Sequence, residues 1–144
     1  MSKVILTFGI FDLIHTGHLN LLERAKAEGD ILIVGVGSDY SVNKEPRKKW
    51  KTIIPSEDRL RLVNALKCVD WAFIYGTYYD LEQSIRAIKP DLYVRGDDWT
   101  KNFPGQKVLN ELKIPIKLLE YTKGISTTLI RERIKNDQRN GNFK

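Results

Sequence analysis

The chain has 144 residues, enough for one domain with its own core; 42% of them are hydrophobic and 29% are charged. The formal net charge of +6 suits an anionic partner such as a nucleotide, and no apolar run is long enough to span a bilayer. The single cysteine, Cys68, excludes an internal disulfide, so we expect a cytoplasmic protein in which Cys68 is a small core residue, with a catalytic thiol as the weaker alternative.

The hydrophobic pattern switches repeatedly between the periods of strands and helices. In chain order it predicts a strand at 3–9, a helix at 17–29, a strand at 31–37, a polar loop at 38–54, a helix at 55–67, a strand at 70–75, a helix at 80–89, a strand at 90–96, a loop at 97–105, a helix at 106–113, a strand at 114–121 and a helix at 126–135.

Local signals support the helix boundaries. Ser56 is a predicted cap of the second helix, and Asp80 with Gln83 predicts a capping box for the third. The apolar residues of the last helix are expected to face the protein interior: Leu129, Ile130 and Ile134.

The alternation predicts an α/β fold, a Rossmann-like, doubly wound, five-stranded parallel sheet with helices on both faces. We assign residues 1–136 to one domain and residues 137–144 to a C-terminal tail. In such sheets ligands bind beyond the carboxyl ends of the strands. Three segments at these ends therefore carry the candidate chemistry: 9–18, 95–99 and 122–128.

Both histidines of the chain, His15 and His18, lie in the first of these segments, FGIFDLIHTGH, near the start of a helix. A zinc site is poorly supported, because the segment offers neither cysteine partners nor a third histidine. Two imidazole donors that neutralise growing charge on a phosphate fit better. The alternative is that one histidine is a helix cap and the other a surface residue.

The third segment, TKGISTT, places hydroxyls after a glycine at a helix start. Gly124 permits close approach or unusual backbone angles, and Ser126, Thr127 and Thr128 follow it. Free backbone N–H groups at a helix start bind anions, so the segment predicts a phosphate site. An ordinary hydroxyl cap is the alternative.

These segments carry a family resemblance. GIFDLIHTGH resembles the phosphate-binding H-x-G-H signature of the nucleotidylyltransferase superfamily, and GISTT resembles its second signature. With PSEDR and RGDDW, the likeness spans residues 3 to 134. The chain is most similar to the cytidylyltransferase branch, typified by glycerol-3-phosphate cytidylyltransferase. It is also similar to the adenylyltransferase domain that makes ADP-heptose for lipopolysaccharide.

The resemblance implies transfer of CMP from CTP to a small phosphorylated acceptor, with pyrophosphate released and Mg²⁺ bound mainly through the nucleotide phosphates. The alternative is transfer of AMP from ATP to a heptose or other sugar 1-phosphate. It also implies a homodimer, with no nucleic acid partner and no metal ligand from the protein.

Site roles follow from the resemblance, residue by residue. It implies that the catalytic residues are His15, His18, Lys44 and Thr127. It implies that the nucleotide is bound by Gly9, Ile10, Phe11, Asp12, Gly17, Gly96, Asp97, Asp98, Trp99, Gly124, Ile125, Ser126 and Thr128. Arg59 is expected to hold the acceptor phosphate. Lys44, together with Arg47, Lys48 or Lys49 of the same basic loop, is expected to close on the phosphates, and a solvated basic loop is the alternative for the last three. The acceptor pocket is expected to involve Trp71, Tyr78, Tyr79 and the 100–106 loop.

The chain departs from the family pattern at one phosphate contact. Tyr121 stands where the cytidylyltransferase branch has an arginine before GIST, and Lys123 could replace that charge without the planar guanidinium. The segment VDWAF is similar to the heptose enzymes, whereas RGDDW favours CTP. A non-catalytic nucleotide- or RNA-binding module is the rival class, but aromatic residues are not interleaved with the basic ones as stacking surfaces require.

Overall fold

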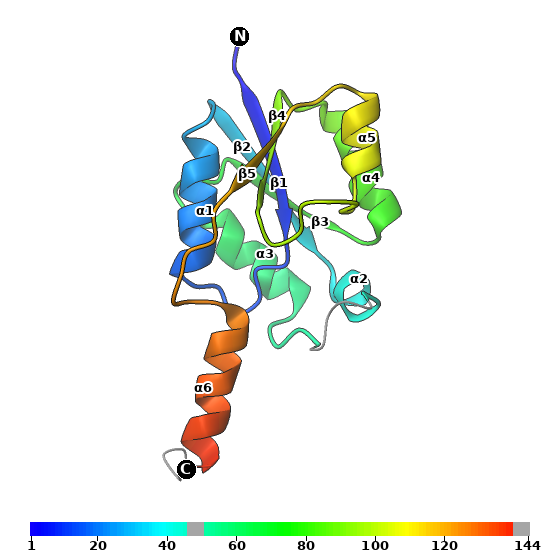
Figure 1. Cartoon of the computed structure of the whole chain (residues 1–144). Coiled ribbons are helices and arrows are strands. Elements are labelled where there is room, and N and C mark those ends of the chain that lie inside the picture. Colours follow the sequence, from blue (N-terminus) through cyan, green and yellow to red (C-terminus); the bar gives the residue numbers. More distant parts are fainter. Residues whose placement is uncertain (46–50, 140–144) are drawn as a thin grey trace.

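A five-stranded parallel sheet forms the centre of the computed structural model, which describes residues 1–45 and 51–139 (Figure 1). The strand order is β3-β2-β1-β4-β5, and every neighbouring pair is parallel. The strands are β1 (Val4–Gly9), β2 (Ile31–Gly37), β3 (Trp71–Tyr75), β4 (Leu92–Gly96) and β5 (Ile116–Leu119). The predicted fold class is confirmed.

Helices cover both faces of the sheet. The helices in the described part of the chain are α1 (Thr16–Lys26), α2 (Asp39–Asn43), α3 (Ser56–Asn64), α4 (Tyr78–Ile88), α5 (Gln106–Glu111) and α6 (Thr127–Arg139), of which α1, α3, α4 and α5 pack against the sheet. Ile5 of β1 packs with α1 and α3 in one buried cluster, whereas its neighbour Leu6 packs with α4 and α5 in the other. Successive strand residues point to opposite faces, so each strand supplies both cores.

The strand order reverses between β1 and β4, and there the pairing is short. β1 pairs with β2 along its whole length, but with β4 only through Ile5–Leu92 and Leu6–Tyr93. Since β1 continues to Gly9 and β4 to Gly96, the two strands separate toward their carboxyl ends. A crevice at such a reversal is the usual ligand position in open α/β sheets. The start of α6 lies below these strand ends in Figure 1.

Two predicted boundaries were wrong for local reasons. The segment 38–54, predicted as a loop, contains α2, which is capped by Ser38 because its hydroxyl accepts from the backbone N–H of Ser41 at 3.0 Å. Helix α4 begins earlier than predicted, with Thr77 and Asp80 forming the capping box in place of Asp80 and Gln83. Both caps join residues three positions apart, and the spacing of apolar residues alone does not predict them.

The last helix also differs from its prediction. It continues through Arg139 and extends away from the sheet (Figure 1), so Leu129 and Ile134 are 39% and 40% exposed rather than inside. Within the described residues, no helix combines the length and the apolar character needed to cross a membrane.

Candidate nucleotide-binding site

The loop after β1 is held in an unusual backbone conformation. Phe11 and Leu13 have positive φ angles of 59° and 50°. The Phe11 ring folds back over Gly9, where an added Cβ would lie 2.7 Å from the ring, so a side chain at this position would displace it. The ring is buried and meets His18 edge-on, with centroids 5.4 Å apart. Gly9 and Phe11 therefore shape the loop that carries the histidines.

His15 and His18 cap α1 reciprocally. Nδ1 of His15 accepts from the backbone N–H of Gly17 at 3.0 Å, and Nδ1 of His18 accepts from the backbone N–H of His15 at 3.2 Å. The rings stack with centroids 3.8 Å apart. An Nδ1 atom that accepts carries no proton, so each neutral imidazole has its N–H at Nε2. The cap thus selects the tautomer that presents Nε2–H donors.

The Nε2 atom of His15 is buried and has no hydrogen-bond partner among the described residues. Desolvation by burial lowers the pKa of His15 below its ordinary value of 6.5. The imidazole is therefore a neutral donor near pH 7 rather than a cation. A buried donor without a protein partner is costly unless a ligand or water satisfies it, which makes this atom a marker of the binding site.

The GISTT segment lies directly against the histidine loop, although more than a hundred residues separate them. The Thr127 hydroxyl donates to the carbonyl of Asp12 at 2.8 Å. Ser126 caps α6, because its hydroxyl oxygen accepts from the backbone N–H of Leu129 at 3.1 Å. Gly124 has a φ of 85°, which favours glycine, and Ile125 approaches Gly17. The two signatures thus form one surface, with a helix start on each side.

The loop after β4 lies at the same carboxyl edge of the sheet. Its Asp97 N–H donates to the Leu119 carbonyl at 3.0 Å, and its carboxylate accepts from the Tyr121 N–H at 3.3 Å. Desolvation, followed by the negative charge and hydrogen bond of Asp98, raises the pKa of the Tyr121 phenol. Trp99 directly follows Asp97 and Asp98 in the sequence. Asp97, which belongs to the segment predicted to contact ribose and base, is therefore hydrogen-bonded to Tyr121.

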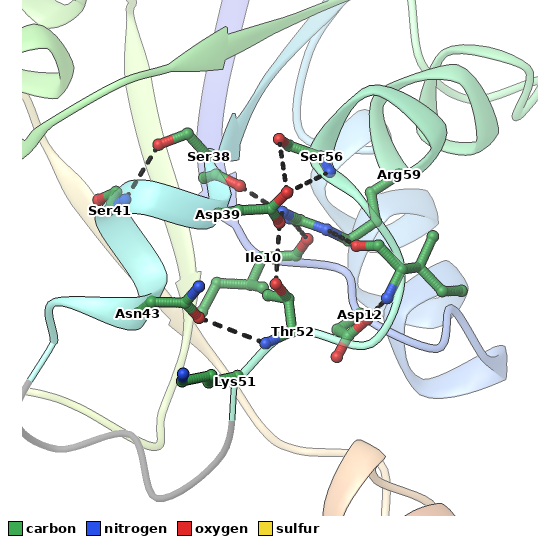
Figure 2. Close-up of polar contacts among 12 residues, drawn as sticks. Ile10, Asp12, Ser38, Asp39, Ser41, Asn43, Lys51, Thr52, Ser56 and Arg59 are labelled. Carbon is green, nitrogen blue, oxygen red and sulfur yellow. Dashed lines mark hydrogen bonds and ion pairs between the residues drawn. The ribbon is translucent and has the colours of Figure 1, made fainter.

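Arg59 occupies a different position from the one predicted (Figure 2). Its side chain is 0% exposed, and four of its five N–H groups have protein partners. Those partners are the carbonyls of Ile10, Gly37 and Ile54 and the Asp39 carboxylate. The guanidinium cannot reach an acceptor phosphate in this arrangement. It instead joins the carboxyl ends of β1 and β2 to the start of α3.

Asp12, predicted in the nucleotide pocket, is also a structural anchor. It is 6% exposed, and its carboxylate accepts from the backbone N–H groups of Ile53 and Ile54, both at 2.9 Å. It also forms an ion pair with Arg131 at 3.2 Å. Asp12 therefore fastens the segment before α3, and α6 as well, to the histidine loop.

Asp39 is a residue beside the site whose structural role the sequence analysis missed. Its carboxylate accepts from Arg59 at 2.7 Å, from the Thr52 hydroxyl at 2.8 Å and from the backbone of Ser56 at 3.1 Å (Figure 2). Ser56 is the first residue of α3 rather than its cap, and Asp39 supplies the missing acceptor. Desolvation raises the pKa of Asp39, but the hydrogen bonds from Arg59, Ser56 and Thr52 together lower it by more, so the pKa lies below its ordinary value. The sequence signal that could have indicated this role is the position of Asp39, two residues after the end of β2.

The remaining predicted residues are placed less centrally. Lys44 ends α2, and its ammonium lies 5.6 Å from the centre of the Tyr40 ring. Trp71 is the first residue of β3 and so lies at the opposite edge of the sheet from the site, which contradicts its place in an acceptor pocket. Tyr78 begins α4 and hydrogen-bonds Glu45. The loop residues 47–49 fall outside the described residues.

The donor set is unlike a metal cage. In the described part of the chain, no group of three or more His, Cys, Asp or Glu side chains is placed to hold a metal ion. Cys68, predicted to be a small core residue, is half-buried against the core, and desolvation raises the pKa of its thiol. The site is instead composed of imidazole N–H groups, hydroxyls and helix-start amides, which bind anions.

Comparison with known proteins agrees with this geometry. A family model described as cytidylyltransferase-like matches residues 6–133. The bifunctional protein HldE of Helicobacter pylori is 38% identical over 134 residues, which cover 93% of this chain and 28% of the relative. HldE of Desulfatibacillum aliphaticivorans is 36% identical and covers 27% of the relative. The chain thus spans little more than a quarter of these relatives.

Solved structures show the same architecture. The lipopolysaccharide core biosynthesis protein from Thermoplasma volcanium superposes with a TM-score of 0.68 at 29% identity, covering 87% of this chain and 100% of that one. Pantothenate synthetase from Thermus thermophilus superposes with a TM-score of 0.56 at 15% identity, covering 83% of this chain and 55% of that one, which shows a shared fold only.

Proposed function

The chain belongs to the cytidylyltransferase-like family, and we propose that it transfers AMP from ATP to a heptose or related sugar 1-phosphate and releases pyrophosphate. The observation that carries the nucleotidyl-transfer proposal is the buried Nε2 of His15, which has no hydrogen-bond partner among the described residues and lies at the start of α1, close to the start of α6. The RGDDW segment favours CTP, but the similarity to HldE proteins and to a lipopolysaccharide core biosynthesis protein favours the ADP-heptose alternative.

The chemistry requires alignment and charge neutralisation. An oxygen of the acceptor phosphate attacks the α-phosphorus of ATP and forms a new O–P bond, while the bond from the α-phosphorus to the bridging oxygen breaks. Pyrophosphate leaves with the electron pair. The nucleophile is already an anion, so no strong general base is needed.

The histidines would act as paired donors at this step. Their Nδ1 atoms are engaged in capping α1, so Nε2–H is the group that can donate to phosphate oxygens as charge accumulates. The neutral state of His15 makes it a hydrogen-bond donor that need not release a proton during the reaction. The start of α6, with Ser126 and Thr127, would bind the β- and γ-phosphates through backbone N–H groups.

Mg²⁺ would enter with the nucleotide, where it neutralises phosphate charge. The residues present fit this arrangement, because they are hydrogen-bond donors toward anions rather than oxygen ligands toward a cation. The loop of Gly96, Asp97, Asp98 and Trp99 would contact ribose and base. Since Tyr121 offers no positive charge, Lys44 and Lys123 would supplement the histidines at the triphosphate.

A pyrophosphate-release assay with Mg²⁺ tests the proposal. It crosses ATP, CTP, UTP and GTP with a heptose 1-phosphate, mannose 1-phosphate and glycerol 3-phosphate, with His18→Ala as the blank. Release with ATP and a sugar phosphate is expected. Release only with CTP would contradict the ATP proposal and identify the chain as a cytidylyltransferase. Nucleotide binding without pyrophosphate from any pair would contradict catalysis and favour a binding module. Light scattering of the same sample tests the expected homodimer.

A further inference from the structure

Arg95 lies near the end of β4, where β4 no longer pairs with β1. It precedes Gly96 at the end of β4 and stands beyond the last residue pair that joins β4 to β1, Leu6–Tyr93. Residues two apart in a strand share a face, so Arg95 lies on the same face as Tyr93, which packs with α4 and α5. Its guanidinium is thus at the topological switch point but on the side opposite α1.

The guanidinium is held in position by aromatic rings. Its central carbon lies 4.1 Å from the centre of the Phe103 ring and 5.7 Å from that of Trp99. Phe103 is buried and stacks on Tyr93, so the surface under the guanidinium is part of the core. Stacking on an aromatic face orients a planar guanidinium while leaving its N–H edges available.

Arg95 forms no ion pair with a described residue. No described carboxylate lies within ion-pair distance of it, and its Nε atom is buried without a hydrogen-bond partner. The other arginines near the site are already engaged, Arg59 by Asp39 and Arg131 by Asp12. A pre-oriented cation with an unsatisfied N–H group, at the point where the strand order reverses, favours an anionic ligand.

We propose that Arg95 binds the phosphate of the acceptor, the role that the buried Arg59 cannot fill. This inference rests on the proposed function, since it needs a phosphorylated acceptor. The loop from β4 to α5, which contributes Trp99 and Phe103, passes from the strand end toward α4 and α5 (Figure 1). The acceptor would then enter on the α4 and α5 side, and the nucleotide phosphates would bind on the side of α1 and α6.

The test separates acceptor binding from nucleotide binding. Calorimetric titrations compare the wild type with Arg95→Met, which keeps an unbranched side chain without the guanidinium, and with Arg95→Lys, which keeps the charge without the planar guanidinium. Arg86→Met is the matched control, because Arg86 is an exposed arginine paired only with Glu111 at the surface. The probes are a heptose 1-phosphate, mannose 1-phosphate and glycerol 3-phosphate, each in the presence of an ATP analogue with a methylene group in place of the oxygen between the α- and β-phosphates, and the analogue alone.

We expect Arg95→Met to weaken binding of the phosphorylated acceptor about 10- to 100-fold, as loss of charge-assisted hydrogen bonds predicts, with Arg95→Lys intermediate. Binding of the ATP analogue should be unchanged in every variant. Weaker analogue binding with unchanged acceptor affinity would overturn the inference, as would a wild type that binds none of the acceptors. If thermal unfolding shows that Arg95→Met does not fold, Arg95→Lys carries the comparison.

The experiments distinguish failure of the proposed function from failure of the proposed role of Arg95. Acceptor binding that depends on Arg95 without pyrophosphate release from any nucleotide would contradict the proposed function and leave the phosphate site in place. Pyrophosphate release with unchanged acceptor affinity and KM in Arg95→Met would support the proposed function and overturn the role of Arg95.

Discussion

The imidazoles of His15 and His18 stack with ring centroids 3.8 Å apart, and each Nδ1 accepts a backbone N–H at the start of α1. One pair of side chains therefore caps the helix through Nδ1, and the cap leaves the Nε2 atom of His15 without a hydrogen-bond partner among the described residues. The roles of these two atoms can be separated by substitution, because asparagine retains an acceptor near the position of Nδ1 but has no counterpart of Nε2.

His15→Asn should lower turnover about 100- to 1000-fold, the loss expected for one donor at developing charge, while the free energy of unfolding stays close to that of the wild type. His15→Ala should lose the same activity and, in addition, about 1 kcal/mol of stability, because the cap is lost. Steady-state kinetics and urea unfolding measure the two effects. Equal destabilisation by both substitutions would contradict the capping role of Nδ1.

The lowered pKa of His15 predicts a pH dependence of stability. As the pH falls below 6.5, the unfolded chain takes up a proton at this residue before the folded chain does, so the free energy of unfolding decreases. The stabilisation is present above 6.5 and is lost as the pH falls through the lower, folded pKa. Urea unfolding of the wild type and His15→Asn from pH 7.5 to 5 should therefore show the wild type losing more stability. A difference that does not vary with pH would contradict the desolvation of His15.

Arg59 should behave as a structural residue. Arg59→Met removes the partner of Asp39 and leaves the carbonyls of Ile10, Gly37 and Ile54 without their donor, so it should cost about 3 kcal/mol or more of unfolding free energy. Arg61→Met, an exposed arginine on the same helix, is the matched control and should change stability little. Chemical unfolding measures both. A fully stable Arg59→Met protein with only a raised KM for the acceptor would restore the predicted phosphate contact.

Lys44 is expected to act on the triphosphate. It ends α2, whose first residue, Asp39, is tied to Arg59, so its backbone is well anchored. Lys44→Ala should lower turnover about 10- to 100-fold, because a cation near the phosphates is lost. Lys51→Ala removes a lysine whose only described contact is through its backbone carbonyl, and it should have a far smaller effect. Equal, mild effects of the two substitutions would contradict a role for Lys44.

The sheet and the meeting of the two signatures could be predicted from sequence, because both follow from local signals. Buried parallel strands appear as apolar runs, and their carboxyl ends necessarily share one edge. The Arg59 and Asp12 contacts could not be predicted, since they join residues 49 and 41 positions apart and depend on the exact chain path. Nothing in the pattern distinguishes an arginine that binds a ligand from one that binds backbone carbonyls. Leu129 illustrates the same limit, because helical spacing does not reveal that no sheet covers α6 there.

The contact between Thr127 and Asp12 predicts coupling between the two phosphate-binding helix starts. The Thr127 hydroxyl donates to the Asp12 carbonyl at 2.8 Å, and this bond sets the distance between the start of α6 and the histidine loop. Thr127→Val keeps the shape of the side chain but leaves that carbonyl without its donor, so it should cost about 1 kcal/mol of stability and raise KM for the nucleotide. Thr127→Ser keeps the hydroxyl and should restore both quantities toward the wild type. Since the backbone N–H groups of α6 are intact in all three proteins, a raised KM in the valine variant alone would show that the position of the helix start, and not its chemistry, controls phosphate binding. An unchanged KM in Thr127→Val would separate the two segments functionally.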